Sequence, residues 1–435
     1  MGAAARAATE WLPLGRGRAV RRLLRVWVVD PPLVLLVLGL TLFGVAMIYS
    51  AGQTNVPEPA VVGAWRRQLV WLVLALVAFT AVSRIPLRWV EWGAVPAYAV
   101  GLVLLVATLV VGTGAGTAAG TRSWIVLGPL RFQPAEAAKL GTILMLARYL
   151  ARRDMAPATL RELVVPGVLV ALPLGLVLLQ PDLGTAQAFV GILFAALFWA
   201  GTPLFLLALL ASPLPALILA FDNRIWGVYI VLVLGALYLW RYRLFFSESI
   251  AVVVANFAAG TVSRPLWDSL ASYQQNRILV FLDPQVDPRG AGYHLIQSMV
   301  AVGSGGLWGK GFLEGTQKRY DFLPEQHTDF IFSVVGEELG YLGVLAALLF
   351  FGLLLARLVR LAERVADPFA GLILLGIFGA WMVHIFVNIG MTVGLVPVTG
   401  IPLPFVSYGG SFLLMSWVAV GLAVRAAHDD ERSLG

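Results

Sequence analysis

Long apolar runs recur along most of this chain of 435 residues. A helix that crosses a membrane needs roughly 20 apolar residues, because the hydrocarbon core of a bilayer is about 30 Å thick. Such runs fall at 31–50, 66–83, 90–112, 134–151, 163–180, 184–201, 203–221, 226–241, 250–266, 328–356, 369–391 and 410–425. Only 13% of the residues are charged, too few to cover a soluble globule. The pattern predicts an all-α polytopic membrane protein with twelve candidate spans.

Two of these candidates are weaker than the rest. Prolines interrupt 203–221, and 226–241 is short. Removing both leaves ten spans and, because two is an even number, does not change the side on which later segments lie. Since neither a soluble-domain segment nor a long sequence repeat stands out, we predict one transmembrane domain over 30–427. A basic segment, 1–29, precedes it and a short tail, 428–435, follows it.

The basic residues indicate the orientation of the chain. If both termini are cytoplasmic, most of the 31 lysines and arginines lie on the cytoplasmic side, as the positive-inside rule requires. Alternation of the spans then places two polar segments, 113–133 and 267–327, on the outer side. Arg66 and Arg67 are exceptions, because they fall at the outer end of a span. The net charge of +7 is thus read as orientation and attraction to anionic headgroups, with no nucleic-acid partner.

The long polar segment 267–327 holds the strongest candidate for a catalytic base. Asp287 lies between Pro284 and Pro288, and glycines follow, so its backbone is constrained. A rigid mount suits a base that must meet one hydroxyl group, although the same residues also suit a simple Asx turn. Further along, glycines from Gly303 onward are expected to interrupt any helix.

Charged residues near the outer ends of three spans are further candidates. Glu136 and Lys139 are three apart on one helical face, so they can pair, either as structure alone or as the polar wall of an outward-facing cavity. Arg122 is available to a phosphate, and Trp124 either stacks on a substrate or anchors the interface. Asp182 follows a proline at a helix start, where it can act as an N-cap or face the cavity.

The absence of cysteine excludes disulfides, thiol catalysis and cysteine metal sites. Carboxylates and four histidines remain as possible metal ligands, and His327 is either one of these or a structural residue. The prolines and glycines of 392–410 forbid a regular helix, so this segment is expected to be a re-entrant or surface loop closed against protein. Its Ser407 adds a neutral polar group to the same face.

Several motifs together resemble the SEDS family (shape, elongation, division and sporulation) of bacterial peptidoglycan polymerases. They are RSWIVLGPLRFQPAEAAKL, QPDLGTA, NRILVFLDPQVDPRGAGYHLIQSMVAVGSGGLWGKG, GTQKRYDFLPEQHTDFIFSVVGEELG and NIGMTVGLVPVTGIPLPFVSYGGS, in family order across residues 121–411. The sequence of the fourth motif resembles that of the rod-shape member of the family more than that of the division member. The resemblance implies a helical bundle of ten core spans.

The resemblance also implies an activity: polymerisation of lipid II into β-1,4 glycan strands during cell-wall elongation, at the outer face of the bacterial inner membrane. The implied partners are lipid II, the growing strand and a class B penicillin-binding protein, a transpeptidase of the PBP2 type. Asp287 occupies the position of the family's essential loop aspartate. The other matching positions are Arg122 and Trp124 in an R-x-W element, Glu136, Lys139 and Asp182 in a polar cavity, and His327 and Asp329 in an H-T-D element.

The chemistry that this activity requires suggests further roles. An α-linked diphosphate donor and a β-linked product fit a single inverting displacement, with Asp287 as general base. Arg122, Lys139 or Lys310, together with Mg²⁺ or Mn²⁺, would neutralise the departing diphosphate, although the metal ligands cannot be named. The alternative is a transporter of lipid-linked precursors, which should place polar residues near the membrane midplane and carry an inverted repeat.

Overall fold

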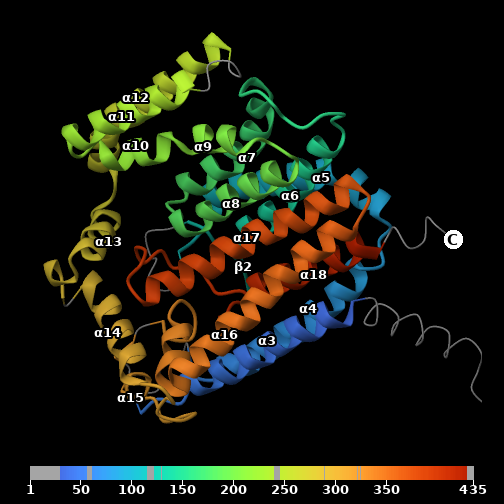
Figure 1. Cartoon of the computed structure of the whole chain (residues 1–435). Coiled ribbons are helices and arrows are strands. Elements are labelled where there is room, and N and C mark those ends of the chain that lie inside the picture. The colour runs from blue at the N-terminus through green and yellow to red at the C-terminus, as the bar shows by residue number, and fades with distance from the viewer. Residues whose placement is uncertain are drawn as a thin grey trace, which may run out of the picture.

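The computed structural model describes residues 30–55, 61–114, 122–128, 130–239, 245–288, 290–320, 322–323 and 325–428. The predicted basic segment 1–29 lies outside these residues, as does the predicted tail 428–435 apart from His428. The described chain is a bundle of long helices, as predicted (Figure 1). Eight of the described helices are long and apolar enough to cross a membrane. The fold is therefore that of a multi-pass membrane protein.

Most predicted spans are helices whose bounds follow the apolar runs. Before the long polar segment they are α3 (Pro31–Ala51), α4 (Ala64–Val82), α5 (Leu87–Val111), α6 (Pro134–Ala151), α7 (Val164–Leu179) and α8 (Leu183–Trp199). After it they are α16 (Ile331–Arg364), α17 (Pro368–Thr392) and α18 (Gly410–His428). Local sequence fixes several starts, because Asp30, Asp182 and Asp367 cap the first turns of α3, α8 and α17.

The predicted span 203–221 is wrong as a single helix. It consists of α9 (Leu204–Ala211) and α10 (Pro213–Leu219), which are divided at Ser212. At about 1.5 Å per residue, neither reaches across a hydrocarbon core of about 30 Å. With α11 (Asn223–Leu239) and α12 (Phe246–Ser269), α10 forms a group beside the main bundle (Figure 1). Helix α9 joins this group to the bundle, because its Leu206 and Leu207 belong to the main apolar core and its Leu209 to a small second core.

The long polar segment is largely helical. It contains α13 (Ser272–Leu282), the 3-10 turn η2 (Pro284–Val286), α14 (Ala291–Ser304) and the short α15 (Thr316–Arg319). The expected interruption at Gly303 is wrong, since that glycine lies inside α14 and the helix ends one residue later. Burial of Leu295, Ser298 and Ala301 on one face of α14, which packs against α16, outweighs the weak helix propensity of glycine.

The earlier polar segment, 113–133, contains a short hairpin that the sequence did not predict. Strand β1 (Ile125–Leu127) pairs antiparallel with β2 (Leu130–Phe132), and Ile125 lies opposite Phe132. A bridge between Thr113 and Trp124 precedes it. The hairpin leads directly into the first turn of α6.

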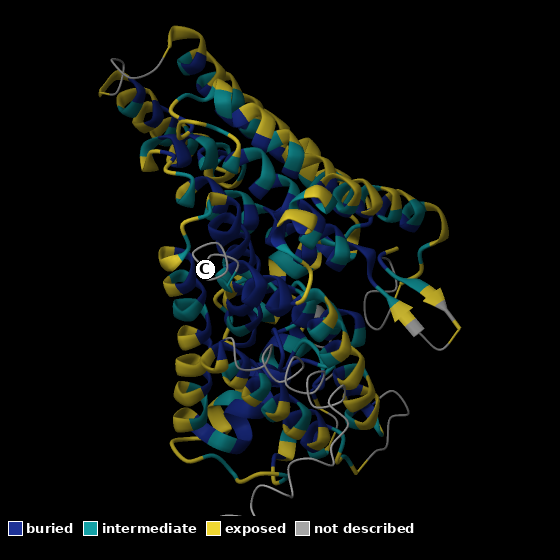
Figure 2. Cartoon of the chain, turned by 90° about the vertical axis from the view of Figure 1, so that its right-hand side faces the viewer, coloured by how far each residue is buried: buried dark blue, intermediate teal, exposed yellow. Residues whose placement is uncertain are grey.

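Helix α17 lies at the centre of the bundle, where α6, α8, α16 and α18 pack around it (Figure 1). In its most apolar 18 residues 78% are buried, against 22% for α4 and α5. Buried residues lie in the interior of the molecule and exposed ones on its outside (Figure 2). Gly379 on α17 faces Gly191 on α8, and a side chain on either would collide with the carbonyl oxygen of the other. Small residues thus permit the close backbone contact that stabilises helix pairs in lipid.

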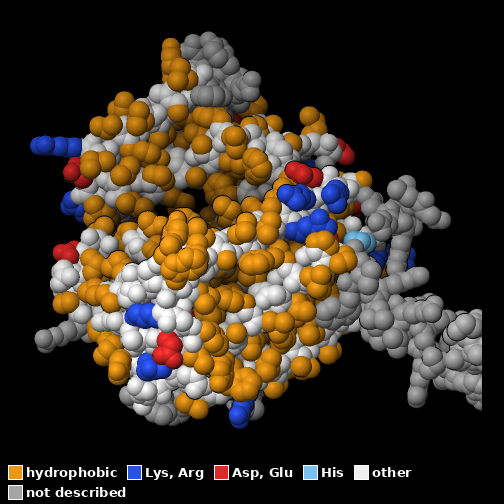
Figure 3. Space-filling view, turned by 60° about the horizontal axis from the view of Figure 1, so that its bottom comes forward, with side chains coloured by type: hydrophobic (Ala, Val, Ile, Leu, Met, Phe, Trp, Pro, Cys, Tyr) orange, Lys and Arg blue, Asp and Glu red, His pale blue; other side chains and the backbone are white. Residues whose placement is uncertain are grey.

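The surface agrees with a membrane environment. Apolar side chains cover most of the face in Figure 3, charges occur in small groups, and the face is hollowed near its centre. Exposed leucines, valines and phenylalanines are distributed along α4, α5, α7, α11 and α16. Such a surface is expected where lipid replaces water as the solvent.

Helix α16 is broken at Gly340, whose φ of 64° and ψ of −164° are outside the helical range. A segment of the long loop fills the break. The backbone N–H groups of Lys310 and Gly311 donate to the carbonyls of Glu337 and Glu338 at 3.0 Å each, and Tyr341 donates to Gly306 at 2.9 Å. The backbone groups released by the break are therefore satisfied by protein, as an apolar environment requires.

Candidate active site

Polar residues gather where α6, α8 and α18 begin. The side-chain amide of Gln133 donates to Asp182 at 3.1 Å and to Thr185 at 3.2 Å. Its backbone N–H donates to the hydroxyl of Ser411 at 3.4 Å. The Asp182 carboxylate also accepts from the backbone N–H of Thr185 at 3.0 Å, so its predicted role as an N-cap is confirmed. One glutamine thus joins three helix starts at one end of the bundle.

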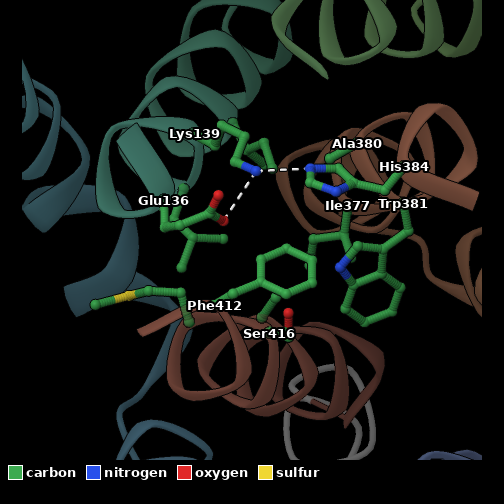
Figure 4. Close-up of a pocket in the computed structure, with 12 residues that line it drawn as sticks. Glu136, Lys139, Ile377, Ala380, Trp381, His384, Phe412 and Ser416 are labelled. Atoms are coloured by element: carbon green, nitrogen blue, oxygen red, sulfur yellow. Dashed lines mark hydrogen bonds and ion pairs between the residues drawn. The ribbon is translucent and has the colours of Figure 1, made fainter. Parts of the chain in front are cut away.

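One turn further into the bundle, Glu136 and Lys139 form the predicted pair. Their charged groups are 2.8 Å apart, and their side chains are only 4% and 5% exposed. The Lys139 ammonium also lies 2.7 Å from Nε2 of His384 on α17 (Figure 4). A buried ion pair needs such additional hydrogen bonds to offset the loss of hydration.

A small cavity adjoins this pair. Its volume of about 20 Å³ holds about one water molecule, and Glu136, Lys139, Trp381, His384 and Ser416 are among the residues that line it (Figure 4). Asp287 is not among them. Glu136 and Lys139 of α6 thus line a small cavity together with residues of α17 and α18.

The predicted non-helical segment between α17 and α18 is confirmed, and it is closed against protein. The hydroxyl of Ser407 accepts from the backbone N–H of Leu403 at 2.8 Å and donates to the carbonyl of Thr328 at 2.7 Å. The side-chain amide of Asn388 donates to the carbonyls of Ile401 at 2.7 Å and Asp329 at 3.0 Å. The Ser407 hydroxyl thus accepts one hydrogen bond and donates another, and both hold the segment in place.

The H-T-D element lies against this segment. The carbonyl of His327 accepts from the backbone N–H of Tyr408, and the two rings are 5.4 Å apart. Burial lowers the pKa of His327, which favours the neutral form of its ring. Arg67 lies over the Tyr408 ring, with its guanidinium carbon 5.7 Å from the centroid, which gives one of the two anomalous arginines a partner at this end.

Among the described residues outside the spans, Asp329 has a carboxyl group whose pKa is strongly raised. Desolvation is the main cause that raises its pKa to about 7. The charges of Glu325 and Asp182 act in the same direction, and that of Arg277 opposes them. Arg277 belongs to α13, a helix of the loop, whereas Asp182 lies at the start of α8, in the bundle. The loop and the bundle thus contribute charges to one region.

The raised pKa predicts how stability depends on pH. Above pH 7 the folded protein holds Asp329 charged in a poorly hydrated place, and this cost disappears as the pH falls from about 7 toward the usual value of 3.8. Asp329→Asn should therefore raise the apparent Tm in detergent at pH 8, and the gain should shrink by pH 5. Scanning fluorimetry across this range measures it, and a gain that grows toward low pH would contradict the assignment.

Asp287 lies in the turn between η2 and α14 and is half-buried. Its Oδ1 accepts from the backbone N–H of Gly290 at 3.0 Å, and its carbonyl accepts from Gly292 at 2.9 Å. A side chain at Gly290 would collide with the carboxylate, and one at Gly292 with the Asp287 carbonyl. The turn predicted from the prolines and glycines is present, and its hydrogen bonds hold both the carboxylate and the carbonyl of Asp287.

The remaining predicted residues occupy two places. Arg122 is exposed, and its backbone N–H donates to the carbonyl of Gln180, which places the R-x-W element beside the start of α8. Trp124 is half-buried on the bridge to Thr113. Lys310, by contrast, is 2.7 Å from the Glu337 carboxylate, in the loop that fills the α16 break.

Three or more His, Asp or Glu side chains do not come together in a metal-ligand arrangement anywhere in the described chain. The residues near Asp182 and Asp329 therefore do not form a protein cage for a cation.

Sequence reasoning missed His384, Gln133 and Asn388 as parts of the site. A usable signal existed for two of them, because His384 and Asn388 are four residues apart in an otherwise apolar span. They therefore share one helical face, and a polar pair within a span normally faces the bundle interior. Gln133 carried no such signal, since its partners are distant in sequence.

Comparison with known proteins gives a consistent result. The chain matches the model of the FtsW/RodA/SpoVE family, described as cell cycle proteins, over residues 31–232 and 209–432. It is 36% identical to the peptidoglycan glycosyltransferase MrdB of Escherichia coli (strain K12), over 93% of this chain and 95% of that protein. It is 35% identical to the peptidoglycan glycosyltransferase RodA of Treponema pallidum (strain Nichols), over 90% and 96%.

Solved structures agree with this result. A chain from a study of how a peptidoglycan synthase complex coordinates polymerization and crosslinking superposes with a TM-score of 0.68 at 33% identity, covering 92% of this chain and 98% of that one. The rod shape determining protein RodA of Thermus thermophilus superposes with a TM-score of 0.60 at 30% identity, covering 92% and 97%. The motifs, the fold and the length of these matches lead to one conclusion: the chain belongs to the SEDS family of FtsW, RodA and SpoVE, on its RodA-like side.

Proposed function

We infer that the chain is a peptidoglycan glycosyltransferase that polymerises lipid II into β-1,4 glycan strands during cell-wall elongation. The observation that carries this inference is similarity over at least 90% of the chain to proteins named for that activity. The arrangement at one end of the bundle supports it, because the motif residue Asp182 from one segment and His327 and Asp329 from another lie at that end. That end is proposed to face the outside of the inner membrane.

The reaction proposed is a single displacement with inversion. The 4-hydroxyl oxygen of one sugar bonds to the anomeric carbon of another, and the bond from that carbon to undecaprenyl diphosphate breaks. Asp287 accepts the hydroxyl proton, and the diphosphate leaves with the bonding electron pair. The fixed turn around Asp287 supports this role, since it limits where the carboxylate can lie.

Cations are needed where negative charge develops on the leaving group. Because Arg122 is exposed, a diphosphate can reach it more easily than the other two proposed cations. Lys139 is enclosed, and we propose that it contributes its positive charge from inside the bundle, where low polarity strengthens electrostatic effects. Lys310, like Lys139, is paired with a carboxylate, and it lies in the loop that fills the α16 break.

A divalent cation, Mg²⁺ or Mn²⁺, is proposed to arrive with the diphosphate, because such ions are held mainly by substrate phosphates and water. Addition of a chelator is then expected to lower the polymerisation rate, and either cation should restore it. The measurement is strand formation from fluorescent lipid II by the purified protein. Full activity after exhaustive chelation would remove the cation from the proposal.

The protein partner proposed is a class B penicillin-binding protein of the PBP2 type, which would crosslink the strand as it grows. Similarity to a chain studied as part of a peptidoglycan synthase complex supports this proposal. Co-purification of the two tagged proteins from membranes tests it.

The alternative function, transport of a lipid-linked precursor, is not favoured, since the relatives that match over the whole chain are named as glycosyltransferases. One experiment separates the two functions. Proteoliposomes that contain the purified chain and fluorescent lipid II are assayed for glycan strands by gel electrophoresis and for movement of lipid II between leaflets. Strands are expected; movement of lipid II without strands would overturn the proposed function.

A further inference from the structure

His384 is a buried group to which neither the motifs nor the proposed reaction assigns a role. It lies on the central helix α17, is 1% exposed, and its ring stacks on Phe412 with centroids 5.0 Å apart. Its two ring nitrogens have different neighbours: Nδ1 is 2.9 Å from the carbonyl of Pro402, and Nε2 is 2.7 Å from the Lys139 ammonium (Figure 4). Both contacts are short enough for hydrogen bonds.

These two neighbours fix the direction of both hydrogen bonds. A carbonyl oxygen can only accept, so Nδ1 of His384 carries the proton and donates to Pro402. In a neutral ring Nε2 then has a lone pair, which accepts from the Lys139 ammonium. A charged imidazole beside a charged lysine would place two positive charges in the bundle interior with only the Glu136 carboxylate to offset them.

The lysine is consequently held on more than one side. An ammonium group has three N–H donors on a flexible stem. One is directed to Glu136 at 2.8 Å and one to His384 at 2.7 Å, while the nitrogen lies 5.5 Å from the centroid of the Phe412 ring. Glu136 belongs to the same helix as Lys139, so of these two hydrogen-bond partners His384 is the one that ties the ammonium to a different helix.

Through its other nitrogen, His384 binds the segment between α17 and α18. Pro402 lies in that segment, which also contains Ser407, and Asn388, one turn further along α17, holds the neighbouring Ile401. Two consecutive hydrogen bonds, through the ring of His384, therefore link the Lys139 ammonium to the segment between α17 and α18.

We propose that His384 is a positioning residue for the glycosyltransferase reaction. As a neutral imidazole with its proton on Nδ1, it holds the Lys139 ammonium in a fixed position relative to the segment between α17 and α18. The inference rests on the proposed function, in which the Lys139 charge stabilises the departing diphosphate. It adds a residue that acts through Lys139 and does not touch the substrate.

Two amide variants separate the two hydrogen bonds of His384. The amide nitrogen of His384→Asn lies near the position of Nδ1 and can still donate to Pro402, but this shorter side chain offers no acceptor to Lys139. The longer His384→Gln can place its amide oxygen near the position of Nε2 and accept from Lys139. His384→Leu removes both bonds, and the apparent Tm of each variant reports on folding.

The assay is polymerisation of fluorescent lipid II by the full-length chain in nanodiscs. His384→Gln should retain most of the kcat, whereas His384→Asn and His384→Leu should lose roughly 10²-fold, the cost of misplacing a reacting group by about 1 Å. KM should change little, because the lysine charge acts on the transition state. Equal kcat values in the Gln and Asn variants, or full activity in the Leu variant, would overturn the proposal.

A second measurement does not depend on activity. In nanodisc protein labelled with ¹⁵N-histidine, solid-state NMR should show that His384, assigned by its loss in His384→Gln, has a protonated Nδ1 and a bare Nε2. Lys139→Met should shift the Nε2 resonance and leave Nδ1 nearly unchanged. A protonated Nε2 in the wild type would overturn the proposal even if the protein polymerises lipid II. The predicted tautomer in a protein that forms no strands would instead count against the proposed function alone.

Discussion

Replacement of Asp287 with asparagine is expected to lower the rate of lipid II polymerisation by about 10²- to 10⁴-fold, the usual contribution of a general base. The amide oxygen of Asp287→Asn can still accept from the backbone N–H of Gly290, so the turn should persist. The loss should therefore appear in kcat while the apparent Tm stays close to that of the wild type. Single-turnover strand formation, followed by gel electrophoresis, measures the rate.

Asp283→Asn is the matched control. Asp283 lies in the same loop, and its carboxylate accepts from the backbone N–H of Gln285 at 2.9 Å, a turn contact comparable to that of Asp287. Because Asp283 has no proposed chemical role, its variant should polymerise at nearly the wild-type rate. An active Asp287→Asn enzyme, or equal losses in the two variants, would reject Asp287 as the base.

The second large effect is expected at Lys318, whose side chain is fully buried. It forms an ion pair with Glu338, which is also fully buried, and donates to the carbonyl of Ser50 at 2.9 Å. Lys318→Met leaves the Glu338 charge without its partner, which costs about 3–5 kcal/mol in comparable buried pairs. We expect a much lower apparent Tm in detergent and a poor yield of folded protein.

Two further variants show whether the unpaired charge is the cause. The double variant Lys318→Met with Glu338→Met removes both charges and should recover much of the lost stability, since apolar replacements of a whole buried pair are often tolerated. Arg319→Met breaks the exposed pair with Glu314 and should cost less than about 1 kcal/mol. A double variant as unstable as Lys318→Met would show that the contacts of the lysine chain, not its charge, stabilise the loop.

Features that depend on nearby residues could be predicted from the sequence. The apolar runs predict most of the helices, the spacing of Glu136 and Lys139 predicts their ion pair, and the proline before Asp182 predicts its cap. Each of these depends on residues within about one helical turn. The prolines around Asp287 likewise predict its turn.

Features that depend on distant contacts could not be predicted. His384 and Lys139 are 245 positions apart, and Ser50 and Glu338 are 288 apart, so nothing in the local pattern indicates either contact. The helices of the long loop were missed for a related reason. Packing of α14 against α16 stabilises a glycine-containing helix that propensity alone disfavours.

The break at Gly340 divides α16 into two helical halves. Before the break, Glu337 and Glu338 accept from Lys310 and Gly311 of the loop. After it, Tyr341 and Leu342 donate to Gly306 and Leu307 of the same loop. A tilt of one half need not bend a continuous helix; it need only rotate the backbone about a single glycine. The loop segment 306–311 bridges the break from both sides, and a tilt of either half of α16 must therefore carry this segment with it.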